Sequence, residues 1–473
     1  MNPSPPNSPL KNAGAGPLAG LPPGPAEQPS RARYGVLGFL CSLAFVLYID
    51  RVCIGKAVIP IQNELGLSNT QMGYVLGAFT VAYGLFEVPT GRWGDRFGSR
   101  GVLTRIVLWW SLFTALTGAA TGLAMLVTVR FLFGAGEAGA YPNVARIIAR
   151  WFPRSERGAA QGFVIFTAQL GGAGAPIVAA YAIDAMGWRA TFVAFSLLGV
   201  VWAVLFHRWF RDDPAQHPAV NAAERTLIAA GHAAASAADG GTDDNAAAAH
   251  ATPHGADHPP IPWRAILSSS NVWLLGTLQT CSSFLSYMFM GWYPTYLEKA
   301  RGVSSIEAGQ LASLVLLGSA VGCLASGYMN DFLARVTHDH PARFRVYGFC
   351  GTLAAAGALL VSIQCESALA TSLWAAVAFM AAISQQATFW AVTTEIGGSH
   401  LGVVFGLMNS MGVPGAFVSS VFLGRFVDWM GERGASGRGQ WDPAFYVYAA
   451  VLVVGACCWL AVDATKKIPD REE

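Results

Sequence analysis

The stretch GRWGDRFGSR, Gly91 to Arg100, lies between two apolar runs of a membrane-span length, 72–90 and 101–121. Its glycines permit a tight turn and close contact between helices. Its aspartate, Asp95, can cap the end of a neighbouring helix or pair with it. When that contact opens, the arginines of the stretch can separate from their partners. A second Gly-x-x-x-Asp run, Gly327 to Asp331, follows a later apolar stretch but lacks the Arg and Gly of the first copy. The two copies indicate an internal repeat.

Composition places the chain among membrane proteins. It has 473 residues, of which 53% are hydrophobic and 12% charged, whereas soluble domains carry about 25% charged residues. The mean hydropathy is +0.42. A net charge of +2 gives no argument for a nucleic-acid partner. The eight cysteines form no CxxC pair, so we interpret them as small apolar residues of buried helices, with no cofactor implied.

The apolar runs predict an all-α membrane protein with twelve transmembrane helices in two six-helix bundles. A span needs about 20 mostly apolar residues, and a polar, Ala- and His-rich stretch from Arg211 to Pro262 separates six runs from six. The predicted spans are 34–57, 72–90, 101–121, 123–145, 160–182, 189–209, 272–295, 309–329, 346–364, 369–394, 402–424 and 444–463. The predicted parts are a disordered tail (1–33), an N-terminal bundle (34–210), a linker (211–270), a C-terminal bundle (271–464) and a second tail (465–473).

Arginine distribution predicts that both termini and the linker are cytoplasmic. Cytoplasmic connections carry an excess of Lys and Arg. Three alternate connections are rich in arginine, whereas those between them are poorer. The arginines concerned are Arg92, Arg96, Arg100 and Arg105, then Arg150, Arg154 and Arg157, then Arg335, Arg343 and Arg345.

Four ionisable residues lie inside predicted spans: Asp50 and Arg51 in the first, Arg130 and Glu137 in the fourth. A charge at the centre of a spanning helix costs about 2.5–3.5 kcal/mol on insertion scales. Arg130 and Glu137 are two helical turns apart and therefore project from nearly one face. The second half has no charge at this depth. The four residues predict a water-accessible cavity with a path for an anion and a proton.

Three motifs resemble a known family of transporters. The stretch from Gly91 to Arg100 resembles the loop signature of the major facilitator superfamily, and Arg130-x-x-x-Gly134-x-Gly136-Glu137 resembles its fourth-helix motif. The run Tyr48-Ile49-Asp50-Arg51 resembles the first helix of one branch, the anion:cation symporter family. The resemblance extends from about Arg33 to Ile468. Cys53 departs from it, because relatives usually have Asn there.

The resemblance implies roles for the charged residues. Arg51 would hold the substrate carboxylate, since its planar fork can donate two charge-assisted hydrogen bonds; the alternative is a permanent ion pair with Asp50 or Glu137. Asp50 could instead pair with Arg130. Glu137 is the first candidate for the proton carrier and Asp50 the second, and the alternative is that both are structural. Gating would involve Gly91, Asp95, Arg96, Arg100 and Asp331.

Polar and aromatic residues in the spans that line the central path of this family are candidates for substrate binding, with packing as the alternative for each. Two further charges have simpler interpretations: Glu87, beside Pro89, as structural, and Lys56 as extending to the membrane surface. Histidines at 250, 254 and 258 belong to a solvated linker, and no metal site is predicted. The substrate-binding candidates are Tyr48, Tyr83, Gln169, Tyr287, Trp292, Trp390 and Asn409.

The sequence therefore predicts a transporter and not an enzyme: a monomeric, proton-coupled symporter of a small organic anion, a sugar acid or an aromatic carboxylate, in the inner membrane. Sodium coupling remains an alternative. An organophosphate antiporter is disfavoured because the seventh span, 272–295, has no Arg or Lys. A membrane sensor is disfavoured because no output domain is visible. Nucleotide-driven transport is disfavoured because the sequence has no G-x-x-x-x-G-K-[ST] motif.

Overall fold

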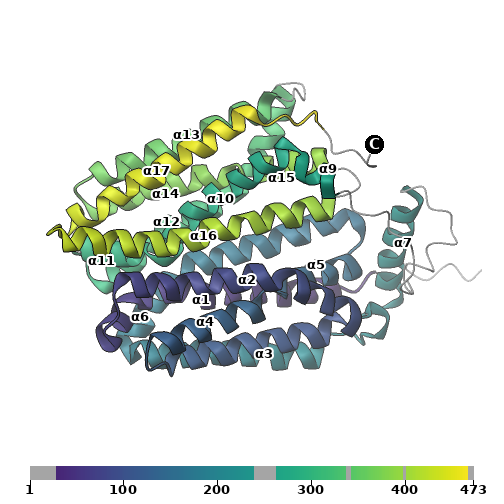
Figure 1. The fold of residues 1–473 in the computed structure, drawn as a ribbon. Helices are drawn as coiled ribbons and strands as arrows, with labels where there is room; N and C mark the ends of the chain where they lie inside the picture. Colours follow the sequence, from purple (N-terminus) through teal and green to yellow (C-terminus); the bar gives the residue numbers. More distant parts are fainter. Residues whose placement is uncertain (1–27, 239–262, 337–341, 398–400, 467–473) are drawn as a thin grey trace, which may run out of the picture.

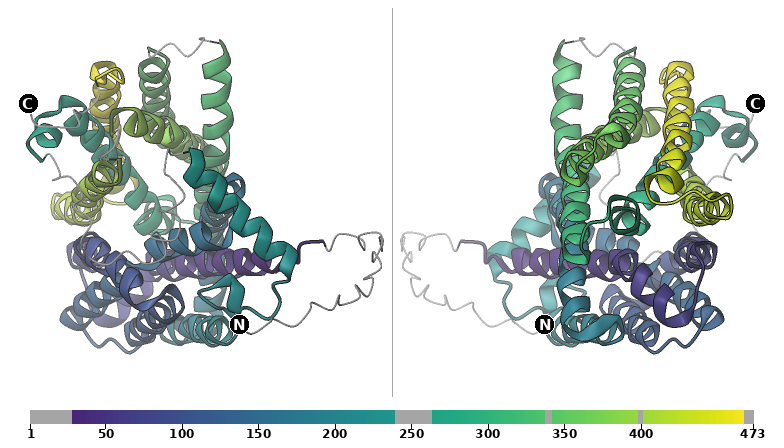
Figure 2. Two further views of the ribbon diagram at one scale, coloured as in Figure 1. Left: turned by 90° about the vertical axis from the view of Figure 1, so that its right-hand side faces the viewer. Right: turned by 90° about the vertical axis from the view of Figure 1, so that its left-hand side faces the viewer.

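The structure is a computed structural model that describes residues 28–238, 263–336, 342–397 and 401–466. Every regular element in these ranges is helical. The helices lie in two layers, the first part of the chain in the lower layer of Figure 1 and the last part in the upper layer. The end views of Figure 2 show the same two layers. The described chain is therefore all-α, as predicted.

The N-terminal layer contains a long helix, α6, that is bent at Gly187. This residue has φ +77°, a backbone conformation that glycine adopts without steric cost. It divides α6 into two arms. The first arm packs closely on α1, where a Cβ at Gly171 would overlap the Phe45 carbonyl oxygen. The helices are α1 (Ala32–Leu65), α2 (Asn69–Phe97), α3 (Ser99–Gly118), α4 (Leu123–Glu137), α5 (Ala140–Trp151) and α6 (Arg154–Trp209).

The C-terminal layer has interrupted helices at Trp292 and Gln385. Gln385 separates α14 from α15, at a place in the chain order that matches the break between α4 and α5 in the first layer. Each layer therefore has a discontinuous fourth helix. The elements are α9 (Trp263–Ser268), α10 (Ser270–Gly291), α11 (Tyr293–Arg301), α12 (Ser305–Val336), α13 (Ala342–Gln364), α14 (Ala368–Ser384), α15 (Gln386–Gly397), α16 (Leu401–Glu432) and α17 (Arg438–Ala461).

Small residues bring the two layers into contact. Along α2, a Cβ at Gly77 would meet the Phe417 ring, and one at Gly84 would meet the Val413 side chain, both on α16. On the other side of the molecule, a Cβ at Gly309 of α12 would lie 2.8 Å from the Pro176 carbonyl oxygen of α6. Glycine at these positions allows helix backbones to approach closely. The two layers are thus held by α2 on α16 and α6 on α12.

Polar contacts close the end of the molecule opposite the linker, where α11 lies (Figure 1). Lys56 donates to Glu298 at 2.5 Å and to Ser305 at 2.6 Å, and it is only 2% exposed. The prediction that Lys56 extends to the membrane surface is therefore wrong, because its ammonium has an anionic partner in the other layer. Asp428 of α16 accepts from the Thr70 backbone N–H at the start of α2, at 2.7 Å.

The first described part of the predicted linker, residues 211–238, is folded against the N-terminal layer. It contains η1 (Pro214–Gln216) and α7 (Ala222–Ala238). Glu224 is fully buried and accepts from Arg33 Nη1 at 3.0 Å and from the Ala32 backbone N–H at 3.2 Å. His217 is also buried and lies against Trp151 and Trp209. Residues 211–228 therefore carry structure that their composition does not indicate.

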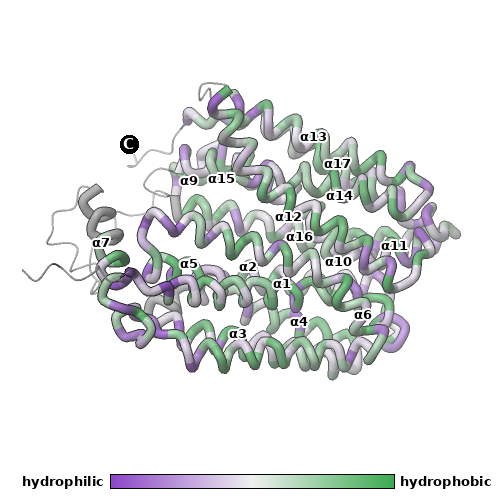
Figure 3. Tube along the Cα trace, turned by 180° about the vertical axis from the view of Figure 1, so that it is seen from behind, coloured by the Kyte–Doolittle hydropathy of each residue, from purple (hydrophilic) through white to green (hydrophobic). Residues whose placement is uncertain are grey.

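Hydropathy agrees with a membrane setting. Nine helices in the described ranges are long and apolar enough to cross a membrane, and the bent α6 is one of them. Apolar residues follow the length of the layers and polar residues collect at their two ends (Figure 3). The twelve spans and the cytoplasmic termini stay predictions. Most of the predicted tails and the linker histidines lie outside the described residues.

Candidate functional site

An ion pair between α1 and α4 forms the centre of the site. Arg51 Nε donates to Glu137 Oε1 at 2.8 Å, and Nη2 donates to the same oxygen. Glu137 Oε2 is buried without a hydrogen-bond partner. Within the described residues, Arg51 Nη1 makes no hydrogen bond. Of the partners that the sequence left open for Arg51, the structure shows Glu137, and the pair leaves one edge of the guanidinium for a second anion.

Aromatic rings surround the Arg51 guanidinium. Its Cζ lies 5.1 Å from the ring centre of Tyr48, 5.0 Å from Phe79 and 4.9 Å from Tyr83. Tyr287, on α10 of the other layer, is within electrostatic reach of the same group. Ring faces attract a cation without neutralising its charge. Arg51 can therefore stay positive here and still bind an anion.

Asp50 and Arg130 lie beside this pair but do not contact each other. Asp50 is 1% exposed, and neither of its carboxylate oxygens has a hydrogen-bond partner. Arg130 is 2% exposed, its Cζ lies 4.5 Å from the Phe133 ring centre, and its Nε is also without a partner. The direct pairing that the sequence allowed for these residues is therefore not formed. Buried polar groups without partners are costly, so this region is not in a fully satisfied state.

Two residues that the sequence analysis did not single out share this region. The Trp110 indole N–H of α3 approaches Asp50 without reaching hydrogen-bond geometry. The neighbouring Ser111 hydroxyl is likewise buried and has no partner. A Cβ at Gly199 would contact both side chains. Nothing in the local sequence marks them, because Trp and Ser are common in apolar helices.

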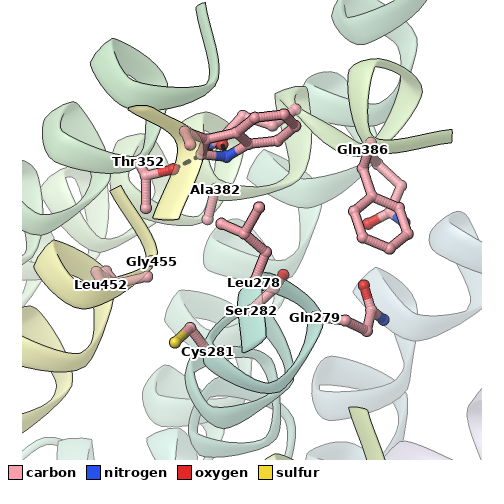
Figure 4. Close-up of a pocket in the computed structure, with 12 residues that line it drawn as sticks. Leu278, Gln279, Cys281, Ser282, Thr352, Ala382, Gln386, Leu452 and Gly455 are labelled. Carbon is pink, nitrogen blue, oxygen red and sulfur yellow. Dashed lines mark hydrogen bonds between the residues drawn. The ribbon is translucent and has the colours of Figure 1, made fainter. Parts of the chain in front are cut away.

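A second polar group lies in the C-terminal layer, and its amide oxygen accepts two hydrogen bonds. Gln385 Oε1 accepts from the Thr352 hydroxyl at 2.6 Å and from the Trp459 indole N–H at 2.8 Å. These residues line a pocket between α10, α13, α14, α15 and α17, into which Gln279 and Ser282 also extend (Figure 4). The pocket contains no charged side chain. Gln385 was not among the residues predicted from the sequence. Only its position at the helix break distinguishes it from other polar residues.

Two of the predicted substrate-binding residues make contacts between the layers. Gln169 donates to the Ser319 hydroxyl of α12 at 3.2 Å. Asn409 of α16 donates to both carboxylate oxygens of Glu87, at 3.1 and 3.0 Å. Glu87, which was interpreted as structural, therefore faces the boundary between the layers.

The remaining two candidates lie apart from Arg51 and its aromatic neighbours. Trp292 is fully buried, its indole N–H donates to the Ser420 carbonyl at 3.0 Å, and its ring packs near Trp441. Trp390 is 38% exposed and packs against Phe405. The structure thus brings together Arg51, Glu137, Tyr48, Tyr83 and Tyr287, but it does not place these two tryptophans with them.

Of the predicted gating residues, Arg100 is described in full. Its Nε donates to the His207 carbonyl at the end of α6, at 2.9 Å, and its backbone N–H donates to Asp212, also at 2.9 Å. Both contacts are within the N-terminal layer. The structure does not describe the surroundings of the other four gating residues, Gly91, Asp95, Arg96 and Asp331. Their gating role therefore stays a prediction.

The fold and this site define a polytopic transporter with a charged centre in one half and a neutral one in the other. A family model, the Major Facilitator Superfamily, matches residues 40–420. The chain belongs to this superfamily, and it is a multi-pass membrane transporter, not an enzyme.

Solved structures and sequence relatives agree with the family assignment. A bacterial homologue of the lysosomal transporter Spinster, in an inward-facing conformation, has a TM-score of 0.72 at 18% identity and covers 91% of this chain and 97% of its own. A probable sulfoacetate transporter of Cupriavidus necator is 31% identical over 94% of this chain and 97% of its own length. A probable galactarate/D-glucarate transporter of Bacillus subtilis is 29% identical over 94% and 97%. A D-galactonate transporter of Escherichia coli O6:H1 is 27% identical over 94% and 98%.

Proposed function

We propose that this chain is a proton-coupled symporter that imports a small organic anion, of the sugar-acid class or a similar carboxylate or sulfonate. The relatives described above are named as transporters of such anions, which supports the class. The single observation that carries the proposal is the Arg51–Glu137 pair: a buried carboxylate holds the arginine through one oxygen only, and an unpartnered Asp50 lies next to it.

The coupling follows from competition for Arg51. An arriving carboxylate can take the guanidinium edge that Glu137 now leaves open and then displace Glu137. Glu137 has no second partner, since its other oxygen is already without one. A buried carboxylate without a counter-ion is costly, and protonation removes that cost. Substrate binding and proton uptake would thus favour each other.

Asp50 and Arg130 extend this scheme by one more group. Asp50 lies within electrostatic reach of both Glu137 and Arg130. When Glu137 is neutral, Arg130 has Asp50 as its nearest buried anion. Protonation of Glu137 therefore alters the balance between the charged and neutral forms of Asp50. We therefore assign Glu137 as the first proton carrier and Asp50 as the second, with Arg130 as the cation between them.

Transport would proceed by rocking of the two layers about the central site. The Lys56–Glu298 and Asp428–Thr70 contacts hold the end opposite the linker closed in this structure. In the proposal the chain has twelve spans, cytoplasmic termini and an inner-membrane location, and it acts as a monomer. The Lys56–Glu298 and Asp428–Thr70 contacts must break in each cycle for the outer end to open.

The test is transport in proteoliposomes containing the purified chain. Counterflow with a panel of sugar acids, sulfoacetate and aromatic carboxylates identifies an anion that is moved. An imposed pH gradient, acidic outside, should then drive accumulation of that anion without sodium. Accumulation that needs a sodium gradient would overturn the proton assignment. Binding without counterflow would overturn transport itself and favour a sensor.

A further inference from the structure

Glu87 continues the surface of α2 that faces Arg51. Phe79 and Tyr83, whose rings both lie about 5 Å from the Arg51 guanidinium carbon, are four residues apart, and Glu87 follows Tyr83 by another four. Residues at this spacing lie on one helix face, and four residues rise about 6 Å. Glu87 is therefore one turn along the same face, toward the linker end, and it is within electrostatic reach of Arg51.

Among the residues whose side chains the structure describes, no cation pairs with Glu87. Its only hydrogen bonds to described residues come from the Asn409 amide, which donates to both carboxylate oxygens across the boundary between the layers. This arrangement fits an ionised carboxylate, which accepts on both oxygens. One turn earlier, Gly84 lies against Val413, so the neighbouring contact is apolar. Among the described side chains, the Glu87 carboxylate is therefore held by a neutral amide and not by a cation.

The site offers one cation to a bound anion. Arg51 has an open guanidinium edge, whereas Arg130 is 2% exposed and packs on Phe133. No charged side chain is buried in the second half of the chain, as far as its residues are described. An anion with its first charged group on Arg51 would therefore meet Glu87 and neutral hydrogen-bonding groups at its other end.

We propose that Glu87 makes the transporter selective for monoanions over dianions. A second carboxylate on the substrate would face Glu87 without a counter-ion among the described side chains, and like charges at short range repel each other. A hydroxyl at the same position would instead donate to Glu87, because an ionised carboxylate is an acceptor only. This inference rests on the proposed function. It separates two kinds of substrate named for the relatives, since galactonate carries one negative charge and galactarate two.

The test compares these two acids, which differ only in whether the sixth carbon belongs to a hydroxymethyl group or to a carboxylate. Uptake of each into proteoliposomes at pH 7, where both carboxylates of galactarate are ionised, gives a mono-to-dianion ratio. We expect the wild type to favour galactonate at least tenfold. In Glu87→Gln, which keeps a side chain that can still bind Asn409, the ratio should fall about tenfold.

A matched control is Glu64→Gln, because Glu64 pairs with Arg189 on the outer surface, away from Arg51; its ratio should equal that of the wild type. Equal uptake of both acids by the wild type, or an unchanged ratio in Glu87→Gln, would overturn the role of Glu87 while leaving anion transport intact. Failure of every acid in the panel to be transported would instead overturn the proposed function.

Discussion

The polar centres of the two halves occupy related places and have opposite chemistry. In the first half, Glu137 ends α4 beside a helix break, and buried charges around it lack hydrogen-bond partners. In the second half, Gln385 lies at the matching break, and its amide oxygen accepts from two neighbours. A charged, incompletely bonded centre can change its partners at little cost. A neutral and satisfied one resists change.

This difference indicates that the two halves have different roles in transport. In the proposed coupling, Glu137 and Asp50 of the first half gain or lose a proton, whereas Arg51 and Arg130 stay positively charged beside them. The second half can act as a fixed frame, with Gln385 bracing α13 and α17 around the broken helix. The first three predictions below test whether coupling depends on the first half and stability on the second.

The largest effect is expected at Arg51. Arg51→Lys keeps a positive charge but loses the planar fork that binds a carboxylate through two hydrogen bonds. Uptake should fall at least about 100-fold, equivalent to about 2.8 kcal/mol, with unchanged folding by thermal unfolding. Arg189→Lys, a change in the same half at an arginine that pairs with Glu64 on the surface, is the control and should transport normally. Normal uptake by Arg51→Ala would exclude Arg51 as the anion ligand.

Glu137→Gln should separate transport from coupling. The amide cannot release a proton, so accumulation driven by a pH gradient should disappear. Exchange of labelled for unlabelled substrate should persist, since Arg51 remains available to the anion. Both are measured in the same proteoliposomes. If this variant still concentrates substrate against its gradient, the charged centre of the first half does not carry the proton.

A change in the second half should affect stability instead. Gln385→Ala leaves the Trp459 indole N–H without its acceptor, whereas the Thr352 hydroxyl can still donate to the Gly348 carbonyl at 2.7 Å. An unsatisfied buried group costs about 1–3 kcal/mol, so the thermal midpoint should fall by several degrees. The ratio of protons to substrate should stay at the wild-type value. A changed ratio would show that coupling is not confined to the first half.

The smallest effect concerns the linker segment on the first half. Burial lowers the pKa of His217 below its usual value near 6.5, and its Nδ1 accepts from the Ala219 backbone N–H. The neutral form is therefore favoured in the folded state, and its contribution is lost as the pH falls below about 6.5. Hydrogen exchange at residues 214–224 should be faster at pH 5 than at pH 7.5. A His217→Phe variant should lose this difference.

The fold was largely predictable from the sequence. Apolar runs of span length, the repeated Gly-x-x-x-Asp and the charges of the first and fourth spans led to a two-layer helical transporter. The resemblance to the transporter family also indicated that Arg51, Glu137, Tyr48 and Tyr83 belong to one site. The folded segment around Glu224 was not predictable from composition, since one buried ion pair holds a sequence that is otherwise poor in apolar residues.

Contacts between the halves were the part that sequence could not provide. Lys56 and Glu298 are 242 positions apart, and Asn409 and Glu87 are 322 apart. Which residues meet across the boundary depends on the rotation and axial position of packed helices, and a periodicity within one helix does not encode either. For the same reason the sequence suggested an Asp50–Arg130 contact that the packing of α1 and α4 does not form.

The most direct test of the account is the number of protons taken up when substrate binds. Calorimetric titration of the purified transporter in two buffers of different ionisation enthalpy measures this number. With the transported anion at pH 7, the wild type should take up a proton as the anion displaces Glu137 from Arg51. Glu137→Gln should bind the anion with correspondingly less proton uptake. Tight binding to the wild type without any proton uptake would contradict the exchange of Glu137 for substrate at Arg51.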